Sequence, residues 1–412
     1  MSLPNEWSLV SLNEVAAPEK GAIRRGPFGG SIKKEIFVAD GYKVYEQQNA
    51  IESNFEIGHY FIDEQKFQDM EGFSVKANDL IISCAGTIGR IAIVPSDARP
   101  GIINQALMRI RPNTSVIMPR YLKWFLESPI AKRDIFGQVA GTALKNLAAI
   151  SEIKKSQIPL PPLEEQRRIA AILDKADEVR RKRKQAIALT EELLKSAFLK
   201  IVGSKNPDYH QWKEVVLAEL ALPVKGSMRT GPFGSTLLHS EFVDEGIAVL
   251  GIDNAVQNRF AWGERRFITS EKYKSLKRYT IKPGDVIITI MGTTGRSAVV
   301  PEDIPTAINT KHLAAITLDN SKALPEYVSN AIHQDPFVLH QIALRNRGAI
   351  MAGLNLGIIK ELKVRLPPLD QQVIYSKVIK QIRQKQEKLE RAANDTNNLF
   401  NSLLQKAFRG EL

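Results

Sequence analysis

The sequence of 412 residues is a duplication, because short motifs of its first half return in the same order in its second half. Repeats of a few tens of residues predict a solenoid, whereas a repeat that takes up half a chain predicts duplicated domains. We therefore expect two related domains. The matching stretches are 7–10 and 212–215, 26–29 and 231–234, 76–79 and 282–285, 86–90 and 292–296, 103–104 and 308–309, 160–163 and 366–369, and 193–198 and 403–408.

The first part of each copy is rich in glycine, proline and short apolar runs. Runs such as 80–83 and 286–290 have the length and composition of buried strands, and each follows a turn that ends in aspartate, a common turn residue. Mixed strands and helices predict an α/β or α+β globule in each copy, over residues 1–160 and 204–366. Further strands are expected at 91–94, 107–110, 297–300 and 313–316, and short helices at 121–127 and 326–333.

The second part of each copy contains no glycine, over residues 162–202 and again over 368–409. A Pro-Pro pair opens each stretch, and proline favours the first turn of a helix. Apolar side chains then recur at alternating spacings of three and four, which is typical of a coiled-coil seam. We expect two long helices, within 161–203 and 367–412, that form an antiparallel coiled coil and separate the globules with internal pseudo-two-fold symmetry. The alternatives are that each helix packs on its own globule or on a second subunit.

The charge balance favours an anionic partner, since 57 Lys and Arg residues against 45 Asp and Glu residues give a net charge of +12. The one cysteine, Cys84, excludes an internal disulfide and a multi-cysteine zinc site, and the six histidines show no metal-ligand spacing. The first residues lack the charged and apolar regions of a leader peptide, and no apolar run approaches the length that spans a bilayer. We therefore expect a cytoplasmic protein with no membrane partner.

The two junctions between globule and helix carry a resemblance to a known family. Residues 158–166 and 365–372 both contain Leu-Pro-Pro-Leu followed by acidic residues and glutamine, and Ile169-Ala170 follows the first of them. With the motifs at 25–29 and 86–90 and the closing stretch 404–412, the chain resembles the specificity subunits of type I restriction–modification systems over essentially its whole length.

The resemblance implies that each globule is a target recognition domain that reads one half of a split, asymmetric target in double-stranded DNA. The helices would form a spacer and dock two modification subunits, which carry S-adenosylmethionine and methylate adenine. Restriction subunits would join them in an ATP-dependent nuclease. The chain itself is then a non-catalytic subunit without a cofactor, because S-adenosylmethionine, ATP and Mg²⁺ belong to its partners. Asymmetry is expected because loops differ between the copies, for example Gln47-Gln48 against Ile252-Asp253.

Residues that bind DNA should be polar and lie on loops. Lys, Arg and backbone NH groups bind phosphates, Arg or Lys reads guanine, and Asn or Gln reads adenine. The alternatives are that the glycines form tight turns with Phe28 and Phe233 in the core, and that Arg90 and Arg296 pair with acids. The candidates are Arg24, Arg25, Gly26, Gly29, Ser31, Lys33, Lys34, Thr87, Arg90, Asn104 and Gln105 in the first copy, and Arg229, Thr230, Gly231, Gly234, Ser235, Thr293, Thr294, Arg296, Asn309, Lys311 and His312 in the second.

Other motifs give weaker signals. The basic run 180–184 predicts a solvated or partner-binding helix face rather than a DNA patch, and Arg183 and Lys385 fall on the predicted seam, where they would fix its register. No Gly-x-x-x-x-Gly-Lys-[Ser/Thr] or Gly-x-Gly-x-x-Gly motif exists, and the Glu-x-Lys stretches 152–154 and 361–363 lack a supporting aspartate. A DNA-specificity subunit is favoured over a coiled-coil adaptor or a single-chain DNA-modifying enzyme with an unrecognised active site.

Overall fold

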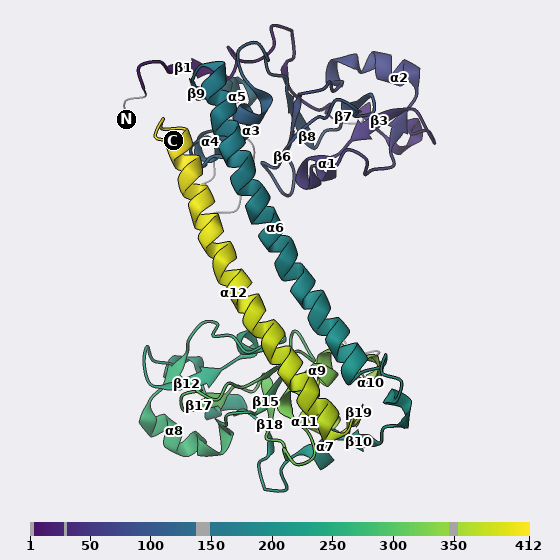
Figure 1. Cartoon of the computed structure of the whole chain (residues 1–412), viewed down its shortest axis with the longest axis vertical. Coiled ribbons are helices and arrows are strands. Elements are labelled where there is room, and N and C mark those ends of the chain that lie inside the picture. The colour runs from purple at the N-terminus through teal and green to yellow at the C-terminus, as the bar shows by residue number, and fades with distance from the viewer. Residues whose placement is uncertain (1–3, 29–30, 137–148, 346–352) are drawn as a thin grey trace. The chain divides into compact units, whose positions relative to one another are not determined.

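The computed structural model describes residues 4–28, 31–136, 149–345 and 353–412. It consists of two units, of which unit 1 comprises residues 1–184 and 392–412 and unit 2 comprises residues 185–391. Two long helices, α6 (Leu163–Ile201) and α12 (Leu369–Ala407), each contribute a segment to both units (Figure 1).

Unit 1 contains two small sheets. The first is antiparallel, in the order β2 (Ile23–Arg25), β8 (Leu107–Ile110), β5 (Leu80–Ser83), β6 (Ile91–Ile93). The second has the order β4 (Phe61–Ile62), β3 (Tyr42–Tyr45), β7 (Gly101–Ile103), and β3 and β7 run parallel. Strands β5, β7 and β8 are wholly buried, and apart from Ser83 and Arg109 they contain only apolar residues and glycine.

Helices and a short strand pair complete unit 1. Strand β1 (Ser8–Ser11) pairs with β9 (Gln157–Leu160), directly before α6. The helices are α1 (Gln47–Glu52), α2 (Glu64–Asp69), α3 (Pro119–Glu127), α4 (Pro129–Phe136) and α5 (Ile150–Lys155). The amphipathic α3 buries its apolar face in the core that also covers the first sheet.

Unit 2 repeats this arrangement. Its first sheet has the order β11 (Met228–Thr230), β18 (Leu313–Ile316), β15 (Val286–Thr289), β16 (Ser297–Val299). Its second sheet has the order β13 (Phe267–Ile268), β12 (Ile247–Leu250), β17 (Ala307–Asn309), β14 (Thr280–Ile281), and β12 and β17 run parallel. The remaining elements are β10 (Glu214–Val216), β19 (Lys363–Arg365), α7 (Leu217–Leu220), α8 (Ser270–Leu276), α9 (Pro325–Gln334), α10 (Pro336–Arg345) and α11 (Leu356–Glu361).

The two long helices pack antiparallel within each unit. In unit 1 the beginning of α6, at Ile169, shares one apolar core with the end of α12, at Phe408. In unit 2 the end of α6 meets the beginning of α12, where the rings of Phe198 and Tyr375 lie 5.7 Å apart. The predicted fold class, two mixed globules with a long antiparallel helix pair, is confirmed.

The alternative that each long helix packs on its own globule also holds in part, because each helix end is built into the core of a globule. The predicted register residue Lys385 is exposed, so that prediction was wrong. Its neighbour Gln386 is buried instead, 2% exposed, while Arg183 is half-buried.

One buried glutamine ties each long helix to its globule. Gln166, fully buried, accepts a hydrogen bond from the Met118 backbone NH (2.8 Å) and donates to the carbonyls of Val116 (3.0 Å) and Pro161 (2.9 Å). The fully buried Gln372 repeats this pattern with the Leu324 NH and two carbonyls. Because these hydrogen bonds join the first turn of the helix to the start of α3 or α9, they fix the angle between helix and globule.

Candidate nucleic-acid interface

The predicted loops of unit 1 meet at one edge of its sheets. The antiparallel register places the end of β2, the end of β5 and the start of β8 side by side, and the parallel pair β3 and β7 ends at the same place. Backbone hydrogen bonds join these loops, from the Asn104 NH to the Tyr45 carbonyl (2.9 Å) and from the Cys84 NH to the Ala106 carbonyl (2.7 Å). We call residues 25–28, 46–49, 84–90 and 104–106 the loop edge of unit 1.

The same edge exists in unit 2, where the Thr310 NH donates to the Leu250 carbonyl (2.9 Å) and the Ile290 NH donates to the His312 carbonyl (3.0 Å). The loop edge of unit 2 comprises residues 230–235, 251–254, 290–296 and 309–312. Four chain segments that are far apart in sequence therefore converge twice, and they carry most of the predicted site residues.

A glycine permits the closest approach between two of these segments. A Cβ atom on Gly26 would lie 1.8 Å from the Asn104 carbonyl oxygen, and one on Gly231 would lie 2.1 Å from that of Asn309. No side chain fits at such distances from the backbone, so only glycine lets the first loop lie against the loop after β7 or β17.

A hydroxyl group holds the Gly-Thr-x-Gly-Arg loop in each unit. The Ser83 Oγ donates to the Thr87 carbonyl (2.5 Å) and accepts from the Arg90 NH (3.0 Å). Thr289 makes the same two contacts with Thr293 and Arg296. The loop is thereby folded back on its strand, with its arginine side chain exposed in both units.

A buried asparagine, which the sequence analysis missed, supports the segment after β3 and β12. Asn49, 1% exposed, accepts from the Glu46 NH (2.8 Å) and donates to the carbonyls of Asn54 and Ile57 (both 2.9 Å). Asn254 accepts from the Gly251 NH (2.8 Å) in the same way. The sequence could have revealed this asparagine, because it returns in both copies, whereas the residues before it at the loop edge differ between the copies.

Buried polar side-chain atoms without a hydrogen-bond partner concentrate at the loop edges. Of twelve such atoms in the described residues, seven belong to loop-edge residues or their direct contacts. Native proteins hold few of these atoms, because each has lost the hydrogen bonds that water would supply. The seven atoms are Arg25 Nε, Gln47 Oε1, Asp253 Oδ2, Arg266 Nε, Asn309 Oδ1, Thr310 Oγ1 and His312 Nδ1.

A hollow of about 460 Å³ lies at the loop edge of unit 2, lined by Asp253, Arg266, Thr310 and His312 among others. Burial lowers the pKa of His312, and the nearby Lys311 and Arg266 lower it further. The imidazole is therefore neutral near pH 7, with one donating and one accepting nitrogen. The hollow presents donors, acceptors and a carboxylate to a planar polar group.

Comparisons with known proteins identify the family of this chain. The sequence profile of the family described as Type I restriction modification DNA specificity domain matches residues 4–189 and 237–396. The chain belongs to this family.

Relatives and solved structures extend the match over the full length. The MjaVIII type I restriction enzyme specificity subunit of Methanocaldococcus jannaschii is 20% identical, over 97% of this chain and 93% of its own. The EcoBI type I restriction enzyme specificity subunit of Escherichia coli is 26% identical, over 48% of this chain and 42% of its own. A chain solved in work on complex assembly and conformational transition of the type I R-M system is 20% identical, covers 100% of both chains and has a TM-score of 0.57. The S subunit of a Type-I restriction-modification system from M. genitalium is 16% identical, covers 99% of this chain and 98% of its own, and has a TM-score of 0.56. These structures share the fold.

Most of the predicted site residues lie at or beside a loop edge. Some are buried and support the loops, and the others are exposed or half-buried and remain candidates for DNA contact. Gly26, Gly231 and Asn309 are buried and support the loops, and Asn104 accepts from the Ala106 NH (3.0 Å). Gly29 lies outside the described residues. The exposed or half-buried candidates are Arg25, Ser31, Lys33, Lys34, Thr87, Arg90, Gln105, Thr230, Gly234, Ser235, Thr293, Thr294, Arg296, Lys311 and His312.

Two predicted arginines do not serve the loop edge. Arg229 is buried, and its guanidinium pairs with Asp285 and donates to the Thr280 carbonyl (2.7 Å) and the Thr317 Oγ (3.0 Å). Neighbouring residues of a strand point to opposite faces of the sheet. The Arg24 guanidinium accordingly lies 4.3 Å from the centre of the Phe73 ring, whereas that of Arg25 lies over Phe28 at the loop edge. We remove both from the candidates.

The expectation that Phe28 and Phe233 fill the core was wrong. Phe28 is 70% exposed and Phe233 is 57% exposed. The glycine before each of them is buried, and so is the proline, so the buried part of the motif is its backbone turn and the ring points away from it.

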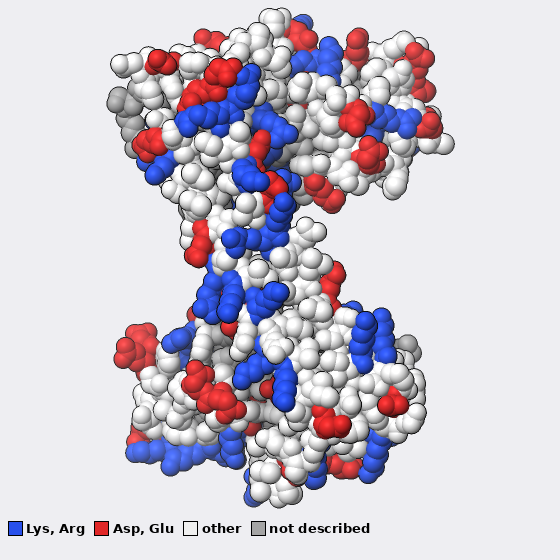
Figure 2. Space-filling view, in the orientation of Figure 1, with Lys and Arg blue, Asp and Glu red and all other residues white. Residues whose placement is uncertain are grey.

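The basic run on α6 is partly neutralised by two acids one turn before it. Arg180 and Arg181 pair with Asp177, and Lys182 pairs with Glu178 at 2.6 Å. Hydrogen bonds from Lys182 and Lys175 lower the pKa of Glu178 to about 2. On the visible face of the molecule, basic side chains line the long helices with acidic ones between them (Figure 2). This arrangement fits the solvated helix face that the sequence predicted.

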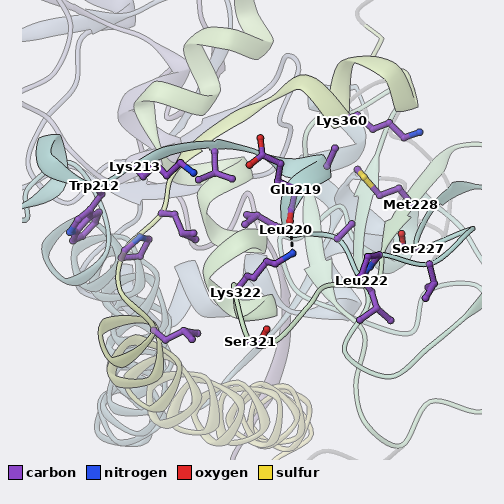
Figure 3. A pocket seen from close by; sticks show the side chains of 18 of the residues that line it. Trp212, Lys213, Glu219, Leu220, Leu222, Ser227, Met228, Ser321, Lys322 and Lys360 are labelled. Atoms are coloured by element: carbon purple, nitrogen blue, oxygen red, sulfur yellow. Dashed lines mark hydrogen bonds between the residues drawn. The ribbon is translucent and has the colours of Figure 1, made fainter.

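A larger cleft of about 1220 Å³ lies elsewhere in unit 2 (Figure 3). Trp212, Leu222, Met228 and Lys322 line it, and Lys322 donates to the Glu219 carbonyl (3.2 Å). Met228 begins β11, whereas Thr230 at the other end of that strand lies at the loop edge. The cleft is therefore separate from the candidate interface.

Within the described parts of the chain, no group of three His, Cys, Asp or Glu side chains is placed to hold a metal ion. Glu152 of the Glu-x-Lys stretch pairs with Lys155 on the surface (3.0 Å). None of the helices in these parts is long and apolar enough to cross a membrane.

Proposed function

We propose that this chain reads an asymmetric, two-part sequence in double-stranded DNA, one part with each globule, and directs modification and restriction subunits to it. The convergence of the four segments at each loop edge carries the proposal. Each edge combines exposed cations, which suit phosphates, with exposed or half-buried polar side chains of the types that read base edges.

The two loop edges differ in the side chains that would read bases. Unit 1 offers Arg25, Gln47 and Gln105, a set suited to guanine and adenine. Unit 2 offers Asp253, Thr310 and His312 instead, and a carboxylate accepts from the amino group of cytosine. Two unlike readers on one chain support a target whose halves differ in sequence.

Membership of the family supports an assembly with other subunits. We propose two modification subunits and restriction subunits as protein partners, with the paired long helices as their docking site. S-adenosylmethionine, ATP and Mg²⁺ then belong to these partners, and this chain contributes recognition without catalysis and without a cofactor.

Selection of bound duplexes from a random library by the full-length chain tests the proposal. We expect two short fixed blocks of different sequence, separated by a constant gap. Two identical blocks in palindrome would contradict the asymmetric target. A lack of enrichment would contradict DNA reading and favour an adaptor, and methyl transfer or cleavage by the chain alone would contradict the non-catalytic role.

Replacing Arg90 or Arg296 by alanine should weaken binding of the selected duplex and reduce its salt dependence. Both side chains are exposed at a loop edge. The slope of log K against log salt is negative, and each phosphate contact that is lost makes it shallower by about 0.9. Binding isotherms at several salt concentrations measure this slope. Arg181→Ala is the matched control, because Arg181 is 73% exposed but lies on α6 beside Asp177. An unchanged slope in both loop-edge variants would show that neither arginine binds phosphate.

A further inference from the structure

Phe28 and Phe233 occupy the same position in the two copies, and both rings face solvent, 70% and 57% exposed. An exposed phenyl ring gives up the hydrophobic stabilisation that burial provides. Single exposed apolar residues are common and need no explanation. A ring exposed at the same position of a motif that both copies contain does need one.

A hydrogen bond and a proline restrict the backbone just before Phe28. Gly26 donates its NH to the Leu107 carbonyl (2.8 Å) and lies against the Asn104 backbone. Pro27 is buried and has a fixed φ angle. Since little conformational entropy remains to be lost, a ring held in this way binds a partner at low entropic cost, as aromatic anchors in interfaces do.

The surroundings of Phe28 suit nucleic acid better than protein, whereas in unit 2 Thr230 stands at the position of Arg25 and Met291 is exposed on the loop edge. The Arg25 guanidinium lies 5.5 Å from the centre of the Phe28 ring, and the nearby Lys33 and Lys34 are exposed. Phe28 is the one large apolar side chain exposed on the described loop edge of unit 1. A protein-binding anchor sits in an apolar patch, whereas an aromatic ring among cations matches surfaces that stack on bases.

We propose that Phe28 and Phe233 are wedges that insert between neighbouring base pairs, one in each half of the DNA target. This inference rests on the proposed function and adds a residue role to it. Apolar side chains inserted in this way unstack a base step and kink the duplex. The polar side chains of the same loop edge then reach base edges next to the opened step.

The test uses the full-length chain and the selected duplex, in which 2-aminopurine replaces one base at a time. Its fluorescence rises where stacking is broken, so binding should raise it at one step in each half. Phe28→Ala should abolish the rise in one half alone, and Phe233→Ala should abolish it in the other. Each variant should bind about tenfold more weakly, since base–aromatic stacking is lost. Phe28→Trp keeps an aromatic ring and should retain both affinity and signal.

Leu9→Ala and Val224→Ala are the controls, because these side chains are also exposed, 57% and 52%, but lie outside the loop edges. They should bind like the wild type, and all variants should keep its melting temperature. Weaker binding with an unchanged fluorescence rise would overturn the wedge, since the ring would then only touch the DNA. Wild-type DNA binding with lost capture of the modification subunit would overturn it in favour of a protein contact. If the wild-type chain selects no duplex, the proposed function itself fails.

Discussion

Asp285→Ala is expected to unfold unit 2 at a far lower denaturant concentration than the wild type. Asp285 is fully buried and accepts hydrogen bonds from the Lys282 NH (2.8 Å), the Thr317 Oγ (2.5 Å) and the guanidinium of Arg229. Removing the carboxylate leaves the buried cation of Arg229 without its counter-charge, which costs about 3–5 kcal/mol. That is a large fraction of the roughly 5–15 kcal/mol that holds a domain folded. Urea unfolding of the full-length chain, followed by circular dichroism, measures the loss.

The matched control is Glu271→Ala, which removes an ion pair with Lys274 whose side chains are 81% and 68% exposed. Exposed pairs contribute about 0–1 kcal/mol, so this variant should unfold like the wild type. The double variant Asp285→Leu with Arg229→Met should recover most of the stability, because apolar side chains of similar size replace the buried pair. Equal urea midpoints for Asp285→Ala and Glu271→Ala would show that the ion pair of Asp285 with Arg229 does not stabilise unit 2.

This ion pair illustrates where the sequence was misleading. Arg229 stands next to a Gly-Pro-Phe-Gly loop, and its position in the chain suggested DNA contact. Its partners, Thr280 and Asp285, lie 51 and 56 positions further along the chain. Arg229 and Asp285 come together because β18 pairs with both β11 and β15. A local motif shows that a side chain is near a loop, but the tertiary structure decides which way it points.

The parts of the fold that were predictable depend on long or strongly apolar patterns. The strand expected at 80–83 is β5, wholly buried as a continuous apolar run implies. The glycine-free stretches contain the two helices of 39 residues. The short strands β4, β13 and β14 have two residues each, too few to carry any periodicity.

The candidate site was predictable loop by loop but not as one surface. The glycine motifs and the residues after Ile103 and Ile308 stood out because they return in both copies. Their convergence follows from strand register, and register depends on pairing between distant segments. The alternative that placed Phe28 in the core rests on the usual burial of phenyl rings. The structure shows instead that the neighbouring glycine and proline take up the buried space.

Gly231→Ala should abolish specific DNA binding through unit 2 while leaving the unit folded. A Cβ atom at this position would lie 2.1 Å from the Asn309 carbonyl oxygen and 2.3 Å from the Thr310 carbonyl carbon. Both are backbone atoms between two strands and cannot give way, so the loop itself must move. Overpacking of this kind costs about 1–3 kcal/mol of stability. A binding site displaced by about 1 Å loses its function, so we expect the selected duplex to lose the part of its specific affinity that unit 2 provides, while the half read by unit 1 is still recognised.

Gly226→Ala is the control, because Gly226 precedes the same strand at its other end. Its φ of +88° makes alanine strained, but a Cβ atom there meets nothing within 4 Å. This variant should lose about 1 kcal/mol of stability through the backbone alone and bind DNA like the wild type. Thermal unfolding and binding isotherms of both variants separate the two effects. If Gly231→Ala binds as tightly as Gly226→Ala, the contact between the two loops does not position the DNA-reading side chains.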